Sequence, residues 1–290
     1  MSQQVSIRRE MEHFVADLSP SDASDASAFE RIDTTRPSQA RAWNYWLGGK
    51  DYYPVDKELA DMLELTYPGM QQIALHARAF LRRAVRHLAE QEGIRQFLDI
   101  GTGLPTVDNT HEVAQRVDPA SRIVYVDNDP VVLVHARALL TSHPEGTCDY
   151  LDADVRDPDD ILQRAARTLD FTKPIALLML GVLGTVRDDD EAGALIGRYL
   201  QAVPAGSYLV VEDGTNVVKP QAAAQAEQLR DEGQVYSYEL RTPERMARFF
   251  DGLELFEPGV VSVSRWRYEG EAVDGVPEEV DAFCGVARKN

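Results

Sequence analysis

The stretch Gln96-Phe97-Leu98-Asp99-Ile100-Gly101-Thr102-Gly103-Leu104-Pro105 decides the fold of this 290-residue chain. An apolar run leads directly into a turn with two glycines, which predicts a buried strand followed by a tight loop. Because glycine has no Cβ, Gly101 and Gly103 allow a ligand to approach the backbone closely. Ligands of open α/β folds bind at this carboxyl edge of the sheet. The stretch therefore predicts a ligand site at the end of one sheet strand.

Strands and helices alternate from residue 94 to residue 290. Five apolar segments are predicted as strands, at residues 96–100, 123–127, 147–151, 175–180 and 208–212. Helical patterns lie at about residues 107–117, 130–142, 158–168, 189–202 and 243–250, and two late strand candidates lie at 253–263 and 282–288. Such alternation is typical of an α/β fold with parallel strands and helices on both faces of the sheet.

The glycine turn departs from the dinucleotide-binding fingerprint, which places a third glycine three residues after the second. Position 106 is Thr106, and Pro105 precedes it. The negative charge of Asp99 opposes a pyrophosphate but favours an ammonium or sulfonium group. These features favour S-adenosylmethionine as the ligand, and they weigh against the alternative of an NAD-type oxidoreductase.

Acidic residues also end the second and third predicted strands. Asp127 is predicted to accept hydrogen bonds from ribose hydroxyls, with Asn128 beside it. Asp154 is predicted to accept from the adenine amino group, and Val155 to lie against the ring. The alternative is that these acids only cap the helices that follow them. Three acids in this order favour a nucleoside site.

The N-terminal third of the chain is predicted to consist of two parts. Residues 1–30 include the polar run SPSDASDAS and are predicted to form a mobile arm, with homodimer formation through this arm as one possibility. Residues 31–93 contain two helical patterns, at 36–47 and 77–88, and are predicted to form a helical cap over the site. Residues 94–290 are predicted to form the catalytic domain.

Composition excludes several classes of function. The formal net charge of −18 disfavours binding to nucleic acid or to an anionic membrane surface. No apolar run reaches the roughly 20 residues of a membrane span. Two cysteines are too few for a disulfide framework, and the histidines show no metal-ligand spacing, so no metal is expected. We expect a cytoplasmic protein.

Several motifs together resemble an actinobacterial family of S-adenosylmethionine-dependent methyltransferases that was long catalogued as a domain of unknown function. The motifs are DTTRP at 33–37, LGGKD at 47–51, FLDIGTGLP at 97–105, VYVDNDP at 124–130, RFFDGLEL at 248–255 and RWR at 265–267. The resemblance implies the class I methyltransferase sheet, with five parallel strands and a C-terminal antiparallel hairpin. It also implies S-adenosylmethionine as the methyl donor.

The resemblance says less about the methyl acceptor. Some relatives methylate indole rings of tryptophan-derived cyclodipeptides, so a small aromatic natural product is one candidate acceptor. Relatives often carry His-Phe after the fourth strand and Ser-His after the fifth, where this chain has Gly184-Thr185 and Glu212-Asp213. These departures imply either a specialised acceptor or a non-catalytic S-adenosylmethionine sensor.

The remaining site predictions rest on position and residue type. Glu212 and Asp213 are the candidates for a general base, and Tyr45 is a further catalytic candidate. The predicted donor contacts also include Tyr53, Arg78, Thr102 and Gly181, with Tyr45, Tyr52 and Tyr53 facing the sulfonium by cation–π attraction and Arg78 pairing with the methionine carboxylate. The predicted acceptor contacts are Tyr52, Leu183, Gly184, Tyr236, Tyr238 and Trp266.

Overall fold

A computed structural model describes residues 31–139, 142–232, 235–269 and 276–290. The predicted N-terminal arm, and with it the predicted route to a homodimer, lies outside the described residues. No helix in these ranges combines the length and apolar character needed to cross a bilayer.

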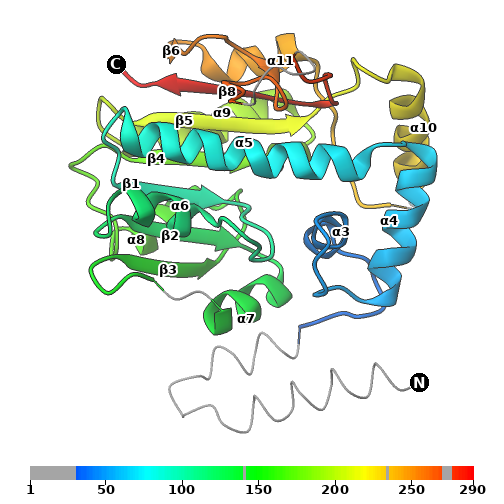
Figure 1. The fold of residues 1–290 in the computed structure, drawn as a ribbon, viewed down its shortest axis with the longest axis horizontal. Helices are drawn as coiled ribbons and strands as arrows, with labels where there is room; N and C mark the ends of the chain where they lie inside the picture. Colours follow the sequence, from blue (N-terminus) through cyan, green and yellow to red (C-terminus); the bar gives the residue numbers. More distant parts are fainter. Residues whose placement is uncertain (1–30, 140–141, 233–234, 270–275) are drawn as a thin grey trace, which may run out of the picture.

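One mixed sheet of eight strands forms the centre of the protein (Figure 1). Its order is β3-β2-β1-β4-β5-β8-β6, and β7 also pairs with β8. β1 to β5 are mutually parallel, whereas β8 runs antiparallel to β5, β6 and β7. The strands are β1 Gln96–Ile100, β2 Arg122–Asp127, β3 Thr147–Asp152, β4 Ala176–Leu180, β5 Tyr208–Gly214, β6 Glu254–Leu255, β7 Val261–Ser262 and β8 Ala282–Arg288. The predicted α/β class and the five parallel strands are confirmed.

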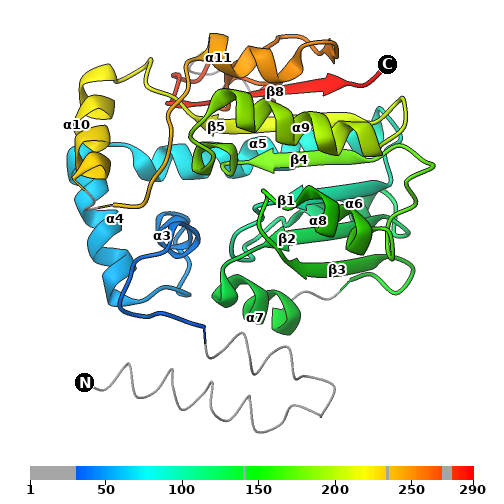
Figure 2. The ribbon, with the colours of Figure 1, turned by 180° about the vertical axis from the view of Figure 1, so that it is seen from behind.

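Helices cover both faces of this sheet, which explains why β4 is apolar throughout and its neighbours β1 and β5 are largely apolar. α5 (Met70–Glu90) and α6 (Thr110–Val117) cover one face, where Phe80 and Val85 pack against Phe97 and Leu178. α8 (Pro158–Ala165) and α9 (Asp189–Ala202) cover the other face, as Figure 2 shows. α7 (Pro130–Leu139) contacts β3. The late part of the chain adds α11 (Pro243–Ala247) and the short 3-10 helix η2 (Arg248–Phe250), while η1 (Leu183–Thr185) follows β4.

Two details of the predicted elements are wrong. The strand expected over residues 253–263 is two short strands, β6 and β7, because Pro258 and Gly259 form a turn between them. Both strands pair antiparallel with β8, so the predicted antiparallel arrangement of the C-terminal strands is confirmed. The prediction also missed the helix α4 (Pro54–Thr66), which begins with Pro54 at its first position.

Three helices stand at the carboxyl ends of the parallel strands. They are α3 (Gln39–Trp46), α4 and α10 (Pro220–Asp231), which lie together beside the sheet in Figure 1. Ala42, Trp46, Leu59 and Leu63 form a separate apolar core between α3 and α4. Within the predicted cap over residues 31–93, α3 and α4 thus lie over the strand ends, whereas α5 packs in the core of the sheet.

A buried ion pair holds α3 to α4. Asp56 is fully buried, and one of its carboxylate oxygens accepts hydrogen bonds from Arg41 Nε and the Tyr53 backbone N–H, both at 2.8 Å. The other oxygen accepts from the Ser38 backbone N–H at 2.8 Å. The Arg41 guanidinium also donates to the Arg36 carbonyl at 2.6 Å. This network fixes the start of α3, which lies over the strand ends.

We expect the Asp56→Ala variant to lose about 3–5 kcal/mol of unfolding free energy, because it leaves the Arg41 guanidinium buried without its counter-charge. Urea unfolding followed by circular dichroism measures this change. Lys57→Ala is the control, since it removes an exposed ion pair with Asp61 that is worth about 0–1 kcal/mol. Equal losses in the two variants would contradict a central role for the Arg41–Asp56 pair.

Candidate functional site

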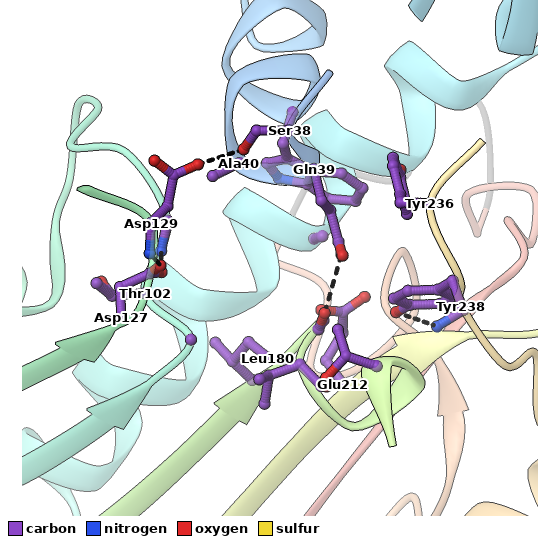
Figure 3. Close-up of a pocket in the computed structure, with 18 of the residues that line it drawn as sticks. Ser38, Gln39, Ala40, Thr102, Asp127, Asp129, Leu180, Glu212, Tyr236 and Tyr238 are labelled. Atoms are coloured by element: carbon purple, nitrogen blue, oxygen red, sulfur yellow. Dashed lines mark hydrogen bonds between the residues drawn. The ribbon is translucent and has the colours of Figure 1, made fainter. Parts of the chain in front are cut away.

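A cavity of about 370 Å³ opens at the carboxyl ends of the parallel strands. It lies where the strand order reverses, since β1 leads to β2 on one side and has β4 on the other. Open α/β sheets bind ligands at such a point. Figure 3 shows Thr102 and Asp127 on one side of the cavity, Tyr236 and Tyr238 on the other, and Gln39 reaching in from α3.

The glycine turn after β1 forms one wall of the cavity. Gly101 and Gly103 have φ angles of +77° and +66°, a region that side-chain-bearing residues rarely adopt. A Cβ on Gly101 would lie 2.5 Å from Cβ of Val182, so the turn after β1 packs against the turn after β4. The N–H groups of Gly101 and Thr102 donate to the Val126 carbonyl at 2.8 and 3.2 Å. The sequence therefore requires glycine here for both conformation and space.

Asp127 joins this turn to the end of β2. Its carboxylate accepts hydrogen bonds from the Gly103 N–H at 2.8 Å and from the Asp129 N–H at 2.9 Å. Burial raises the pKa of Asp127 to about 6. Asp127 lines the cavity, and its oxygens have further lone pairs for a ligand hydroxyl.

Asp99 and Arg78 lie at the same end of the cavity. The Thr110 hydroxyl donates to Asp99 at 2.6 Å, and burial raises the pKa of Asp99 to about 6. Arg78 Nε donates to the Val107 carbonyl at 3.1 Å, and an Arg78 terminal nitrogen donates to Asn109 Oδ1 at 2.9 Å. Burial lowers the pKa of Arg78, while the charge of Asp99 opposes this shift. Arg78 is therefore a pre-oriented cation facing the cavity rather than an exposed surface charge.

Several polar residues after the ends of β2 and β3 also line the cavity. Asn128 Nδ2 donates to Asp154 Oδ2 at 3.2 Å, and the Arg156 N–H donates to Asp154 Oδ1 at 2.9 Å. Val155 is buried next to them, and all four residues line the cavity. A carboxylate beside an apolar side chain suits the amino group and ring of a purine.

Two side chains at the start of α3 connect the cap to the strand ends. The Ser38 hydroxyl donates to Asp129 after β2. Gln39 Nε2 donates to the Gly181 carbonyl after β4 at 3.2 Å, as drawn in Figure 3. α3 is thus bonded to both sides of the point where the strand order reverses. The sequence analysis did not identify Ser38 or Gln39, although both directly follow the DTTRP motif.

Glu212 lines the cavity from β5, two strands away from Asp99 on β1. Its side chain is 4% exposed, and no group in the described ranges donates a hydrogen bond to its carboxylate. Burial, reinforced by the negative charge of Asp213, raises the pKa of Glu212 to about 8. A Cβ on Gly181 would lie 3.8 Å from Glu212 Oε2, which places this oxygen beside the turn after β4.

Tyr238 packs beside Glu212 because two glycines leave space for its ring. A Cβ on Gly184 would lie 2.3 Å from Cζ of Tyr238, and a Cβ on Gly214 would lie 3.2 Å from its ring. The Tyr238 hydroxyl donates to Asp213 Oδ1. Asp213 itself is fully buried behind this tyrosine and does not line the cavity, so its carboxylate is not placed to act as the general base predicted from the sequence.

Three predicted aromatic contacts also lie outside the cavity. The Tyr45 hydroxyl donates to Asp61 at 2.9 Å on the outer side of α3, and the Tyr52 ring packs edge-on against Tyr45. Tyr53 caps α4 and packs beneath the Arg41 guanidinium. Tyr45 is thus bonded to α4, and Tyr53 packs with Leu104 after the glycine turn and with Val131 and Val132 of α7. The predicted contacts of these tyrosines with a ligand in the cavity are therefore wrong.

Two predicted acceptor contacts lie in the cores. Leu183 is fully buried with the side chains under α8 and α9. Trp266 packs edge-on against Phe80 under α5, and its backbone carbonyl accepts a hydrogen bond from Arg83. Gly184 does not line the cavity either and acts only through the ring of Tyr238. The other predicted contacts do line it: Tyr236, Tyr238, Arg78, Asp99, Gly101, Thr102, Gly103, Asp127, Asn128, Asp154, Val155, Gly181 and Glu212.

Most of the apolar residues that line the cavity near Tyr236 were not predicted from the sequence. Trp43, Tyr67 and Ile73 line it from α3, the end of α4 and α5. Asp281 also lies there and accepts from the Thr215 hydroxyl and three backbone N–H groups at 2.7 to 2.8 Å, and from Tyr67. The helical period of α5 predicts that Ile73 faces inward. No local sequence pattern predicts Trp43, Tyr67 or Asp281, which come together through the tertiary fold. Within the described ranges no cluster of His, Cys, Asp or Glu could hold a metal ion.

A protein-family model described as S-adenosyl methyltransferase matches residues 25–290. The chain belongs to this family. A DUF574 family protein from Streptomyces avermitilis is 44% identical, with a TM-score of 0.84, over 90% of this chain and all of that one (100%). A protein from Thermobifida fusca is 40% identical, with a TM-score of 0.81, over 89% of this chain and 97% of that one. None of the curated proteins compared with the chain matches it.

A more distant structure shares the fold alone. It is magnesium protoporphyrin IX methyltransferase from Synechocystis with bound S-adenosylhomocysteine, at 12% identity and a TM-score of 0.51 over 86% of this chain and 93% of that one. The protein is therefore an S-adenosylmethionine-dependent methyltransferase with the class I fold. The cavity fits this donor, since a glycine turn and three strand-end acids line it and Arg78 stands beside them.

We expect Gly101→Ala to lower the affinity for S-adenosylhomocysteine about tenfold or more, equivalent to about 1.4 kcal/mol. The added Cβ clashes with Val182 and moves the turn into the donor end of the cavity. Gly93→Ala is a matched control, because Gly93 has a φ of +70° but nothing within 4 Å of an added Cβ. Isothermal titration calorimetry measures both affinities, and an unchanged value for Gly101→Ala would contradict the assigned role of the turn.

The raised pKa of Glu212 predicts a pH-dependent stability. The folded protein retains a proton on Glu212 up to about pH 8, whereas the unfolded chain releases it near 4.5. The stability of the wild type relative to Glu212→Gln therefore falls as pH rises through this window, by about 1.4 kcal/mol per pH unit. Urea unfolding between pH 5 and 7.5 tests this slope, with the exposed Glu58→Gln as control. Parallel curves for wild type and Glu212→Gln would refute it.

Proposed function

We propose that this methyltransferase transfers a methyl group to a small aromatic molecule, with an indole-bearing compound such as a tryptophan-derived cyclodipeptide as the leading candidate. The observation that carries the proposal is the composition of the cavity wall beyond Gly181. This wall is apolar and aromatic, and it is lined by Trp43, Leu63, Tyr67, Met70, Ile73, Val235, Tyr236, Tyr238 and Leu240. A flat apolar molecule is the ligand that such a wall fits.

The other end of the cavity is proposed to hold the methyl donor. Asp127 accepts from the ribose hydroxyls, while Asp154 and Val155 contact the adenine amino group and ring. Arg78 pairs with the methionine carboxylate, for which its guanidinium is already oriented by Asn109. Gly101 and Gly103 allow the backbone to approach the donor closely.

The chain contributes chiefly by positioning. S-adenosylmethionine supplies an activated methyl group when it is bound, so the protein needs to align the acceptor with that group and exclude water. Gln39 and Ser38 hold α3 over the cavity, which shields its centre from solvent. Tyr236 and Tyr238 provide aromatic surface on the acceptor side.

We expect labelled methyl groups to pass from S-adenosylmethionine to at least one member of a panel of tryptophan-derived cyclodipeptides and simple indoles. Asp127→Asn is expected to weaken donor binding by about 1–3 kcal/mol, the scale for a hydrogen bond to a charged group. Asp152→Asn, which alters the neighbouring strand end outside the cavity, is the matched control. Mass spectrometry detects the product and calorimetry measures donor binding.

The outcomes separate the candidate functions. Donor binding without methylation of any panel member would contradict the aromatic acceptor and favour a non-catalytic sensor. Binding of NAD in place of S-adenosylmethionine would contradict the whole assignment of the cavity.

A further inference from the structure

The cavity contains one buried carboxylate without a partner. Glu212 is 4% exposed, faces the cavity and receives no hydrogen bond from the described residues. A buried carboxylate normally has a donor or a counter-charge, because an isolated charge in an apolar site is costly. Glu212 therefore has lone pairs that are available only to a molecule inside the cavity.

The groups around Glu212 make the electrostatic potential at this position negative. Asp213 lies behind it, with one oxygen bonded to Tyr238 and the other 3.9 Å from Arg241. Arg241 is itself committed to the Leu183 carbonyl and Asp189, each at 2.8 to 2.9 Å, so it does not neutralise Glu212.

The other polar groups of this region are also committed to partners within the protein. Arg83, whose charge reaches Cys284, donates to the Trp266 and Val263 carbonyls. Asp281 is held by the Thr215 hydroxyl and by backbone N–H groups, and Tyr67 donates to Asp281. Cys284 is the register partner of Glu212 on β8, and burial raises the pKa of its thiol. The cation that lines the cavity nearest to the glycine turn, Arg78, is bonded to Val107 and Asn109 at the donor end. A ligand with a positive charge or an N–H group complements this arrangement.

We propose that the methyl acceptor is an aromatic amine, whose ammonium group is bound by Glu212 and whose nitrogen receives the methyl group. The proposal rests on the proposed function and narrows its acceptor class, since a cyclodipeptide whose only nitrogens are amides and an indole N–H carries no ammonium group, whereas other small aromatic molecules do. The positive charge of the bound ammonium lowers the pKa of Glu212, so the carboxyl group releases its own proton to solvent on binding. Glu212 then accepts one proton from the ammonium, which frees the nitrogen lone pair. This pair forms the nitrogen–carbon bond as the carbon–sulfur bond of the donor breaks and leaves its electron pair on sulfur. The products are a methylated ammonium, the thioether and protonated Glu212.

The chemistry at Glu212 disfavours other acceptor classes. A carboxylate or phenolate acceptor would place a further negative charge beside Glu212 and Asp213. Of the two cations among the described lining residues, Arg78 is assigned to the donor and Arg156 is bonded to Asp154 and the Thr185 carbonyl. An uncharged alcohol would donate one hydrogen bond but gain no ionic attraction. The raised pKa of Glu212 is closer to the pKa of an amine than the pKa of an ordinary glutamate is. This smaller difference favours proton transfer from the ammonium to Glu212.

The test compares tryptamine with tryptophol, which has a hydroxyl in place of the amine, by calorimetry on protein saturated with S-adenosylhomocysteine. The wild type is expected to bind tryptamine at least tenfold more tightly than tryptophol. Glu212→Gln is expected to abolish this preference while its affinities for tryptophol and S-adenosylhomocysteine stay within twofold of wild type. Glu58→Gln removes an exposed carboxylate and is the charge-matched control. With labelled S-adenosylmethionine, nuclear magnetic resonance of the tryptamine product is expected to show an N-methyl group.

Each other result overturns the proposal in a recognisable way. Equal binding of the two probes, a preference that persists in Glu212→Gln, or no binding of either probe would each reject the amine site. A parallel loss of S-adenosylhomocysteine affinity in Glu212→Gln would assign Glu212 to the donor instead. Failure of the wild type to bind S-adenosylhomocysteine would reject the proposed function itself, which is a different result from any of these.

Discussion

The carboxylate of Asp127 connects three parts of the molecule through a short chain of hydrogen bonds. It accepts from the Gly103 N–H in the turn after β1 and from the Asp129 N–H at the start of α7, and Asp129 in turn receives the hydroxyl of Ser38 at the start of α3. The turn, the end of β2 and the cap therefore share one set of bonds. A residue without two acceptor oxygens at position 127 would disconnect them, whether or not a ligand is bound.

Most of the sheet and of the donor end was predictable from the sequence, because local signals determine them. β1 and β8 have the predicted bounds, since apolar runs bounded by charged residues or glycine leave little choice of register. Gly101, Asp127 and Asp154 each lie at the carboxyl end of a strand or within two residues of it, so the common edge of a parallel sheet brings them together. The chain order alone was sufficient to place them in one cavity.

The aromatic residues were less predictable, because their positions depend on the rotation of helices and on tertiary packing. Tyr45 lies on α3 and Tyr53 directly precedes α4, yet Tyr45 bonds Asp61 and Tyr53 packs against Arg41. Gln39, at the start of α3, instead reaches into the cavity. Trp266 fills the core under α5 rather than the acceptor side. Gly184 differs from the residue that relatives often carry at this position, which marks it as a candidate in the sequence. Only the structure shows that the ring of Tyr238 occupies the space that a side chain at position 184 would need.

The position of α3 also affects how the two ligands influence each other. The same short helix carries Gln39, which bonds the turn after β4, and Trp43, which lines the acceptor wall. Any displacement of α3 caused by one ligand thus reshapes the surface that the other ligand meets. By thermodynamic linkage, the two binding free energies are coupled to the same extent in both directions. Donor affinity in this enzyme is therefore a property of the ternary complex as well as of the donor end alone.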